Sequence, residues 1–296
     1  MRIPSIVLVL SIASSSAAQD FDAVEIETID LGAGLAMLVG RGGNLGLSVG
    51  EDGSFLIDDQ FAPLTPKIQA AVEAFGGGPI RFVLNTHYHG DHTGGNEPLG
   101  RAGAVVVAHR NVRERMSRPQ HNALRGTTMP QSPDAALPIV TYEEGVAFHL
   151  NGHTIRAYHA PNAHTDGDSI LFFENSNVMH MGDTYFAGMY PYIDVDGGGS
   201  IQGMIAAAER GVALANDDTR VIPGHGPLSN RSELAAYRDM LIAVRLAVQQ
   251  HVGAGHTVDQ TVAARPTRDL DLQWTTGFMK PEHIVRITYR SLSTPD

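Results

Sequence analysis

The sequence contains no cysteine. This absence excludes disulfide bonds, thiolate metal ligands and a cysteine nucleophile together. It leaves the compartment open, because a chain of 296 residues can build a sufficient hydrophobic core without disulfides. A metal site in this protein must therefore use imidazole or carboxylate ligands.

Lysine is nearly absent as well, with only Lys67 and Lys280, and the arginines are scattered along the chain. The formal net charge is −11 at pH 7, so there is no basic excess that could displace counterions from a nucleic acid. Hydrophobic residues make up 43% and charged residues 18%, which is typical of a globular protein. We therefore expect a small-molecule substrate and no nucleic-acid partner, while the oligomeric state stays open.

Long apolar runs are missing except at the N-terminus. Residues 1–18 contain one positive residue, Arg2, then an apolar run, then small residues at Ser16 and Ala18. This order is typical of a signal peptide cleaved after Ala18, and the run is too short to cross a bilayer as a mature helix. A buried first helix is the alternative. We expect a single mature domain over residues 19–296, periplasmic or secreted and without a membrane anchor after cleavage.

The rest of the chain alternates short apolar segments with glycine-containing turns, and the pattern occurs twice. In each half, apolar strand segments precede a helical pattern, which predicts two sheets that face each other with helices outside. Strands are predicted at residues 23–29, 34–40, 44–50, 54–59, 80–84, 104–108, 146–149, 154–160, 169–173, 178–181 and 219–222, and helices at 63–75, 201–215 and 229–252. Residues 111–137 are polar and contain three prolines, so they form either a mobile flap or a plain surface excursion.

The chain has 14 histidines, and a cluster of them follows the predicted strand at residues 80–84. The run is His87-Tyr88-His89-Gly90-Asp91-His92. Alternate residues of an extended segment point the same way, so His87 and His89 can bind one cation. Gly90 permits a sharp turn that directs Asp91 and His92 toward a second cation. Imidazole and carboxylate ligands without thiolate suit zinc, and also iron or manganese.

Each cation needs further ligands, and three candidates follow other predicted strands. His164 lies in a turn-forming stretch, Asp183 follows residues 178–181, and His225 follows residues 219–222. Each of these residues alone is more typical of a satisfied loop position than of a ligand. Together with the first cluster they indicate a binuclear metal site.

These residues resemble the metallo-β-lactamase superfamily of binuclear metal hydrolases. The family's landmarks occur in order within residues 30–230: Asp58, His87-x-His89-x-Asp91-His92, His164, Asp183 and His225. The resemblance implies an α/β fold, an αββα sandwich of two mixed sheets flanked by helices, with two Zn2+ ions at one sheet edge and iron or manganese as alternatives. It also implies that the first metal takes His87, His89 and His164, that the second takes Asp91, His92 and His225, and that Asp183 bridges them. Asp58 is implied to orient a ligand imidazole by accepting its free N–H.

The implied chemistry is hydrolysis by a hydroxide that bridges two zinc ions, with Asp91 holding it in orientation. We predict a cyclic amide such as a β-lactam as the substrate, because the predicted signal peptide favours an exported enzyme. A lactonase or a glyoxalase II-like thioesterase is the alternative. Asp183 stands where the best-known β-lactamases of the family carry cysteine or serine, and residues 184–208 contain no lysine or arginine to anchor the drug's carboxylate. A phosphodiesterase and a non-catalytic metal-binding module rank lower.

Three tyrosines follow Asp183 closely, namely Tyr185, Tyr190 and Tyr192. They predict either an aromatic wall of the substrate pocket or a loop packed on the sheet. The remaining histidines lack partners at ligand spacing, and we expect them in surface or satisfied core roles. Ser200 is predicted as the N-cap of the helix over residues 201–215, and Trp274 as a packing anchor.

Overall fold

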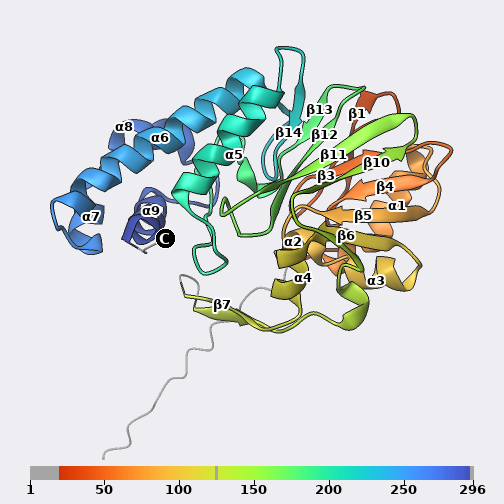
Figure 1. Cartoon of the computed structure of the whole chain (residues 1–296), viewed down its shortest axis with the longest axis horizontal. Coiled ribbons are helices and arrows are strands. Elements are labelled where there is room, and N and C mark those ends of the chain that lie inside the picture. The colour runs from red at the N-terminus through yellow and green to blue at the C-terminus, as the bar shows by residue number, and fades with distance from the viewer. Residues whose placement is uncertain (1–19, 124–125, 294–296) are drawn as a thin grey trace, which may run out of the picture.

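The computed structural model describes residues 20–123 and 126–293, so the predicted signal peptide lies outside the described residues. The described chain forms two mixed β-sheets with helices on their outer faces (Figure 1). This arrangement confirms the αββα sandwich expected from the sequence. Among the described helices, none is long and apolar enough to cross a membrane.

The first sheet comes from the N-terminal half of the chain and has the strand order β1-β2-β3-β4-β5-β6-β9. Strands β1 to β4 pair antiparallel, whereas β4, β5, β6 and β9 run parallel. The bounds are β1 (Glu27–Gly32), β2 (Leu35–Val39), β3 (Leu45–Ser48), β4 (Ser54–Ile57), β5 (Ile80–Asn85), β6 (Val105–His109) and β9 (Val140–Tyr142).

The second sheet has the order β10-β11-β12-β13-β14-β15. All its neighbours pair antiparallel except β13 and β14, which are parallel. The bounds are β10 (Gly145–Leu150), β11 (His153–Ala160), β12 (Asp168–Phe173), β13 (Val178–His180), β14 (Arg220–Ile222) and β15 (Ser229–Asn230).

Apolar side chains from both sheets meet in a buried layer between them. Because alternate residues of a strand point to opposite faces, every second residue reaches this layer. Phe55 of β4 packs on Phe148 of β10 with ring centroids 5.0 Å apart. Leu84 of β5 and Ile222 of β14 are buried in the same cluster. This packing brings the ends of β5 and β14 to the same edge of the sandwich.

Helices cover both outer faces. Helix α1 (Thr65–Ala74) packs its buried residues, Ile68 and Val72, on the first sheet. Helices α5 (Ile201–Leu214) and α6 (Arg231–Gly253) pack on the second sheet, and the Ser200 hydroxyl accepts from the Gly203 amide, which confirms the predicted N-cap. The other described helices are α2 (Gly90–Thr93), α3 (Asn96–Arg101), α4 (Arg110–Met116), α7 (Val258–Ala264), α8 (Arg268–Trp274) and α9 (Pro281–Ser293).

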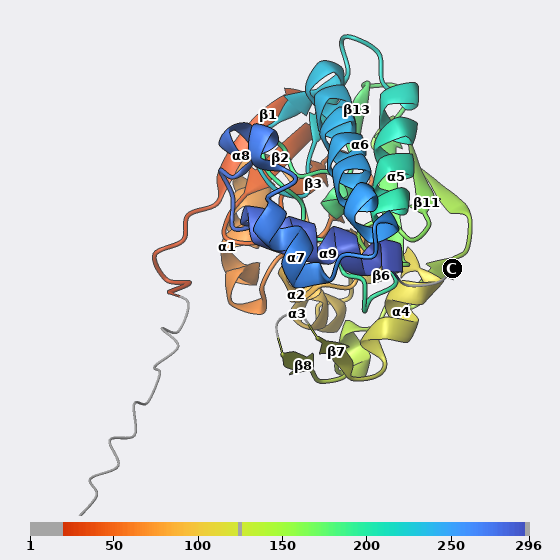
Figure 2. The ribbon, with the colours of Figure 1, turned by 90° about the vertical axis from the view of Figure 1, so that its left-hand side faces the viewer.

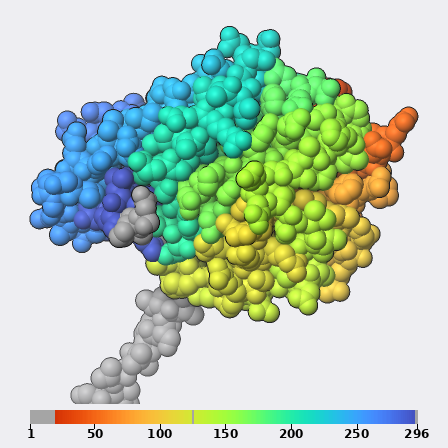
Figure 3. Space-filling view, in the orientation of Figure 1, coloured from red at the N-terminus to blue at the C-terminus, as the bar shows by residue number. Residues whose placement is uncertain are grey.

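The three C-terminal helices have no counterpart among the predicted elements. Helix α9 packs against α6 and α7, and Figure 2 shows these helices together on one side of the molecule. Trp274, at the end of α8, is only 5% exposed and its ring lies 6.2 Å from that of Tyr237, which confirms its role as a packing anchor. In the space-filling view of Figure 3, the dark blue atoms of α9 adjoin the lighter blue atoms of α6.

Residues 111–137, where the sequence predicts either a mobile flap or a plain surface excursion, contain regular secondary structure. They include most of α4 and a two-stranded hairpin formed by β7 (Gln120–Asn122) and β8 (Thr127–Met129). The hairpin contacts the segment after β13, because the Asn122 side-chain amide donates to the Tyr192 hydroxyl over 2.5 Å. The surface of the sandwich next to this segment is therefore partly covered by a separate element.

Candidate metal centre

The candidate ligands follow strand ends at one edge of the sandwich. Asp58 directly follows β4 and the His87 run follows β5 in the first sheet. In the second sheet, Asp183 follows β13 and His225 follows β14. Since the carboxyl ends of neighbouring parallel strands meet at the same edge, loops after these strands converge.

Four residues form the first group of potential ligands: His87, His89, His164 and Asp183. Their ligand atoms all lie within 4.8 Å of one another. His89 Nδ1 lies 3.1 Å from His87 Nε2 and 2.8 Å from His164 Nε2. Asp183 Oδ2 lies 3.8 Å from His87 Nε2 and 3.5 Å from His164 Nε2. Tetrahedral ligands about 2.0–2.1 Å from a zinc ion are separated by about 3.4 Å, so this group has the size of a four-coordinate site.

Asp91, His92 and His225 form the second group. Asp91 Oδ2 lies 3.5 Å from His225 Nε2 and 3.8 Å from His92 Nε2. The other carboxylate oxygen of Asp183, Oδ1, lies 3.2 Å from His92 Nε2 and 3.4 Å from His225 Nε2. Asp183 therefore presents one oxygen to each group, which is the geometry of a bridging ligand. The structure brings all seven predicted ligands together.

Two buried atoms at the junction of the groups have no hydrogen-bond partner, His92 Nε2 and Asp183 Oδ1. Leaving a buried polar atom unpaired costs about 1–3 kcal/mol. In the first group, the nitrogens of three imidazoles face one another at short range. A divalent cation in each group would satisfy these atoms, so the residues fit a pair of metal ions.

Asp58 fixes the orientation of two imidazoles. Its Oδ2 accepts from His92 Nδ1 over 2.8 Å and from the Thr86 hydroxyl over 2.7 Å. Because the Thr86 hydroxyl donates to Asp58, its oxygen accepts from His87 Nδ1, 3.0 Å away. Each of the two rings therefore carries its proton on Nδ1 and turns the Nε2 lone pair toward the candidate ligand atoms. The structure thus agrees with the orienting role expected for Asp58, and it adds Thr86 as a relay to a second ring.

The conformation of Asp58 is itself unusual. Its backbone is left-handed, with φ of 60°, a region that non-glycine residues seldom adopt. Its Oδ1 accepts from the Thr86 amide over 2.7 Å, so the carboxylate receives three hydrogen bonds in total. A costly conformation held by several bonds is typical of a functional site.

The other two imidazoles of the first group have different partners. His89 Nε2 lies 2.9 Å from Asp194 Oδ2, so its Nδ1 faces the group. His164 Nδ1 lies 2.8 Å from the backbone carbonyl of Tyr192, which can only accept, so its Nε2 lone pair faces the group. Both rings are therefore held in the tautomer that a metal requires.

Burial and charge set the protonation of the site. Burial lowers the pKa of His87 well below its ordinary value, and it lowers the pKa of His164 to about 4. Burial opposes ionisation of Asp183, but His225 and His92 hold the pKa of its carboxyl well below the usual range. Neutral imidazoles beside an ionised carboxylate are the states that a divalent cation needs.

His92 behaves differently from the other two buried imidazoles. Burial would lower its pKa, but Asp183 and Asp58 raise the pKa of His92 well above its ordinary value. A cation at Nε2 would take the place of this proton, so metal binding and protonation compete at His92.

Two glycines allow the loops to approach the ligands closely. A Cβ on Gly43 would lie 2.1 Å from Cε1 of His92, and a Cβ on Gly224 would lie 2.1 Å from Oδ1 of Asp183. Neither position has room for a side chain. The amide of Asn44 also donates to the Gly224 carbonyl over 2.8 Å, which joins the two loops beside the second group.

The site is open at three of its seven residues. Asp91 is 30% exposed, His225 20% and His89 16%. Phe278 is 54% exposed, and its ring lies 6.4 Å from that of His225, next to this opening. The buried Phe186 stacks on the other side of His225, with centroids 5.2 Å apart. A substrate can therefore reach both groups from the side of these exposed residues.

The aromatic-wall interpretation needs correction for two tyrosines. Tyr185 and Tyr190 are 1% and 0% exposed. Their hydroxyls have partners in the core, Ser229 and Asp271 respectively. Both tyrosines belong to the apolar cluster beneath α5 and α6. A buried tyrosine is stable there because its hydroxyl has a hydrogen-bond partner. Tyr192 lies near the site, its ring centroid 5.8 Å from that of His164.

Sequence reasoning missed Asp194, Thr86 and Phe278. Asp194 lies in a glycine-containing loop more than one hundred residues from His89, so local spacing carries no signal for this contact. Thr86 adjoins His87, and a hydroxyl next to a predicted ligand is a detectable signal. Phe278 lies between helices that the sequence pattern did not predict.

Comparison with known proteins agrees with this geometry. A family model described as "Metallo-beta-lactamase superfamily" matches residues 38–225. A hydroxyacylglutathione hydrolase from Polaromonas sp. is 27% identical over 179 residues, which cover 60% of each chain. The lactamase-like protein aptB from Emericella nidulans is 29% identical over 147 residues, covering 50% of this chain and 38% of its own. The chain thus spans about three-fifths or less of the length of these relatives.

Solved structures share the fold at low sequence identity. The DIM-1 metallo-beta-lactamase superposes with a TM-score of 0.60 and 14% identity, covering 74% of this chain and 98% of its own. The sec-alkylsulfatase Pisa1 from Pseudomonas sp. gives a TM-score of 0.69 and 16% identity, covering 90% of this chain and 50% of its own. At these identities the likeness concerns the fold alone.

Proposed function

The chain belongs to the metallo-β-lactamase superfamily of hydrolases, and from this premise we propose that it is a binuclear metal hydrolase acting on a small carbonyl compound. One observation carries the proposal. Two groups of ligand atoms share the carboxylate of Asp183. Imidazole nitrogens face one another in the first group, and in the second His92 Nε2 and Asp183 Oδ1 are buried without a hydrogen-bond partner. We propose zinc as the metal, with iron or manganese as alternatives, because all the donors are imidazoles and carboxylates.

A pair of divalent cations bound there would lower the pKa of a water molecule and polarise a carbonyl oxygen. The residues around the site supply orientation and charge. Asp91 is the most exposed carboxylate of the site, so it is placed to accept a proton from water and to hold that water toward the substrate. Asp58 and Asp194 hold three imidazoles in place directly or through Thr86, so the geometry is set before substrate arrives.

We propose a thioester or a lactone as the substrate. The bridging position holds Asp183 rather than the cysteine or serine of the best-known β-lactamases, and one relative is named a hydroxyacylglutathione hydrolase. A β-lactam is the second candidate. The predicted signal peptide favours it, since it indicates an exported enzyme, although residues 184–208 offer no cationic side chain for the drug's carboxylate.

The experiment is a substrate panel with zinc-reconstituted protein. S-D-lactoylglutathione, a simple γ-lactone and nitrocefin are assayed under the same conditions, with His89→Ala as the control for metal-dependent turnover. Thioester or lactone turnover that is lost in His89→Ala supports the leading assignment. Turnover of nitrocefin alone supports the β-lactam, and no turnover of any of the three contradicts a carbonyl hydrolase.

Export remains part of the proposal. The first 18 residues have the order of a signal peptide, and we propose a periplasmic or secreted enzyme cleaved after Ala18. N-terminal sequencing of protein from a periplasmic extract tests this point. A mature chain that begins at Gln19 is expected, and a full-length chain in the cytoplasm would contradict it.

A further inference from the structure

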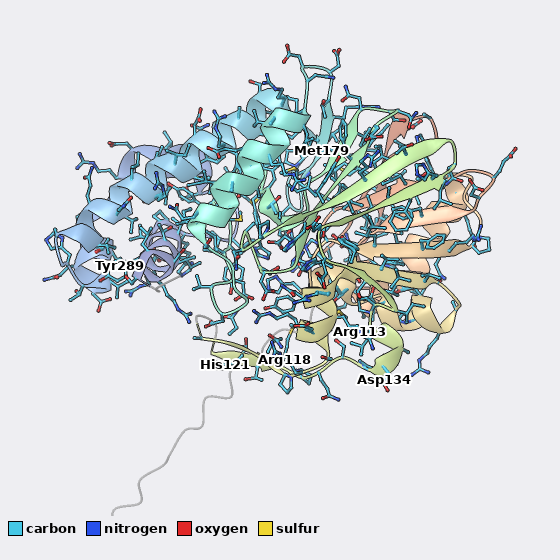
Figure 4. The ribbon with its side chains drawn as sticks, viewed as in Figure 1. Arg113, Arg118, His121, Asp134, Met179 and Tyr289 are labelled. Atoms are coloured by element: carbon cyan, nitrogen blue, oxygen red, sulfur yellow. The ribbon has the colours of Figure 1, made fainter. Side chains whose placement is uncertain are left out.

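A cavity of about 470 Å³ shares one lining residue, Tyr192, with the surroundings of the candidate metal centre. The rest of its lining comes from Ala123, from the segment just after Tyr192 and from the C-terminal helices α7 and α9. Tyr289, one of its lining residues, lies on α9 and is labelled in Figure 4, and its hydroxyl donates to the backbone carbonyl of His256 over 2.8 Å. Its apolar lining consists mainly of Tyr192, Ile193, Val195, Val258, Ile287 and Tyr289. The volume falls within the range of small-ligand pockets.

Tyr192 connects this cavity to the metal centre. It lines the cavity, and its ring centroid lies 5.8 Å from that of His164 and 6.1 Å from that of His89. Its backbone carbonyl also accepts the hydrogen bond that orients His164. Tyr192 therefore borders both the first group of metal ligands and the apolar cavity.

The charged residues at the cavity are compensated. Arg290 pairs with Asp196, and Arg286 pairs with Asp259 over 2.8 Å. A second bond joins Asp196 to the Ala123 amide over 2.8 Å. Since these charges already have partners within the protein, the cavity is suited to an uncharged apolar group rather than to a carboxylate or an ammonium group.

We propose that the substrate carries an unbranched apolar chain, the acyl chain of an ester or thioester or the side chain of a lactone, and that this chain occupies the cavity. This inference rests on the proposed hydrolase function, which it makes more specific. The reacting carbonyl lies at the metal centre and the chain runs past Tyr192 toward Val195 and Tyr289. The C-terminal helices, together with the segment from Tyr192 to Asp196, then select the substrate.

A chain-length series tests the proposal. The metal-loaded full chain is assayed with p-nitrophenyl esters from acetate to decanoate. Each methylene buried in an apolar site tightens binding roughly threefold to fourfold, so kcat/KM is expected to rise steeply with chain length until the cavity is full. A flat or falling series would overturn the proposal.

A cavity-filling variant locates the effect. Val195→Phe places a larger side chain in the cavity, and we expect the ratio of decanoate to acetate kcat/KM to fall at least tenfold. Val195→Ala, which enlarges the cavity, serves as a second variant if the larger side chain impairs folding, and it should move the preferred length upward. The matched control is Leu246→Phe on the exposed side of α6, where the residue is 48% exposed and the ratio should not change. An unchanged ratio in both Val195 variants contradicts the assignment.

A binding measurement separates this inference from the proposed function. Calorimetry on the metal-loaded protein compares 1-octanol with 1-butanol, two neutral probes that cannot be hydrolysed. Tighter binding of 1-octanol that Val195→Phe weakens supports the cavity even if no ester is turned over, in which case the hydrolase proposal alone fails. Ester turnover without preferential 1-octanol binding overturns the cavity assignment and leaves the hydrolase standing.

Discussion

The Nε2 atom of His89 lies 2.9 Å from Oδ2 of Asp194, and the Tyr88 hydroxyl lies 2.5 Å from the same oxygen. Asp194 is 3% exposed, so this carboxylate is a buried charge next to the first group of ligands. The hydrogen bond from His89 keeps the pKa of Asp194 below its ordinary value, although burial opposes this effect. Asp194 is therefore ionised, and its carboxylate positions the ring of His89 by accepting a hydrogen bond from it.

We expect Asp194→Asn to weaken metal binding in the first group by about tenfold or more, because loss of an outer-shell acceptor typically has this effect. The second group should be unaffected. Competition with chelators of graded affinity resolves the two sites. Tyr88→Phe is the matched control, because it removes the other donor to the same oxygen and leaves the bond from His89 in place. Equal losses in both groups would contradict a local positioning role.

His89→Ala is expected to lose metal and activity while the fold survives. The sheets are held together by an apolar cluster that includes Phe55, Leu84 and Ile222, so we expect their packing not to depend on a bound ion. Circular dichroism and denaturant unfolding of the variant should match those of the metal-free wild type. Loss of a cooperative unfolding transition would show instead that the metals are structural.

The shared position of Asp183 predicts different losses for two carboxylates. Asp91 faces only the second group, whereas Asp183 presents an oxygen to each group. After dialysis, Asp91→Ala should retain about one metal ion per chain and Asp183→Ala less than one, as measured by elemental analysis. Retention of two ions by Asp183→Ala would contradict a bridging carboxylate.

His109 is expected to make the fold sensitive to acid. Its ring stacks on that of His159 at 3.7 Å, and burial together with this neighbour lowers its pKa to about 4. A lowered histidine pKa means that the unfolded chain binds the proton first, so stability is complete above pH 6.5 and is lost as the pH falls toward 4.

His109→Asn removes this titration and keeps a side chain suited to cap α4, since His109 Nδ1 accepts from the Asn111 amide. Between pH 7.5 and pH 5, the variant should lose about 1–2 kcal/mol less unfolding free energy than the wild type. Urea denaturation at both pH values measures the difference. Parallel losses in the two proteins would rule out His109 as the source.

Phe278 should act on substrate binding rather than on stability. It is 54% exposed and lies beside His225 at the open side of the site. Phe278→Ala is expected to raise KM severalfold with little change in kcat, because an apolar contact made equally in the ground and transition states affects binding alone. Leu272→Ala, at a residue that is 97% exposed, is the control. A lower kcat at constant KM would place Phe278 in a different role.

Much of the sandwich could be predicted because its strands are short apolar segments separated by turn residues. The runs that became β4 and β5 are short, apolar and followed at once by polar residues, so both the strands and the ligand loops after them were visible. The approach of Asp183 to the His87 run follows from the same logic, since both come after parallel strands.

The C-terminal helices could not be predicted from periodicity because α7 and α8 are too short to repeat a pattern. One local signal was available for α7, where Thr257 and Gln260 form a capping box. The error for Tyr185 and Tyr190 has another cause. Their partners, Ser229 and Asp271, lie far along the chain, so the sequence could not show that their hydroxyls are satisfied in the core.

Phe278 and six of the eleven residues that line the cavity lie beyond the last candidate ligand, His225, whereas the other five, Tyr192 and Val195 among them, precede it. Under the proposal, part of the substrate selectivity is therefore encoded after the residues that bind metal. Random mutagenesis confined to residues 254–293 should yield variants with new substrate preferences that still hold both metals. Such a library offers a direct way to retarget the enzyme without rebuilding its chemistry.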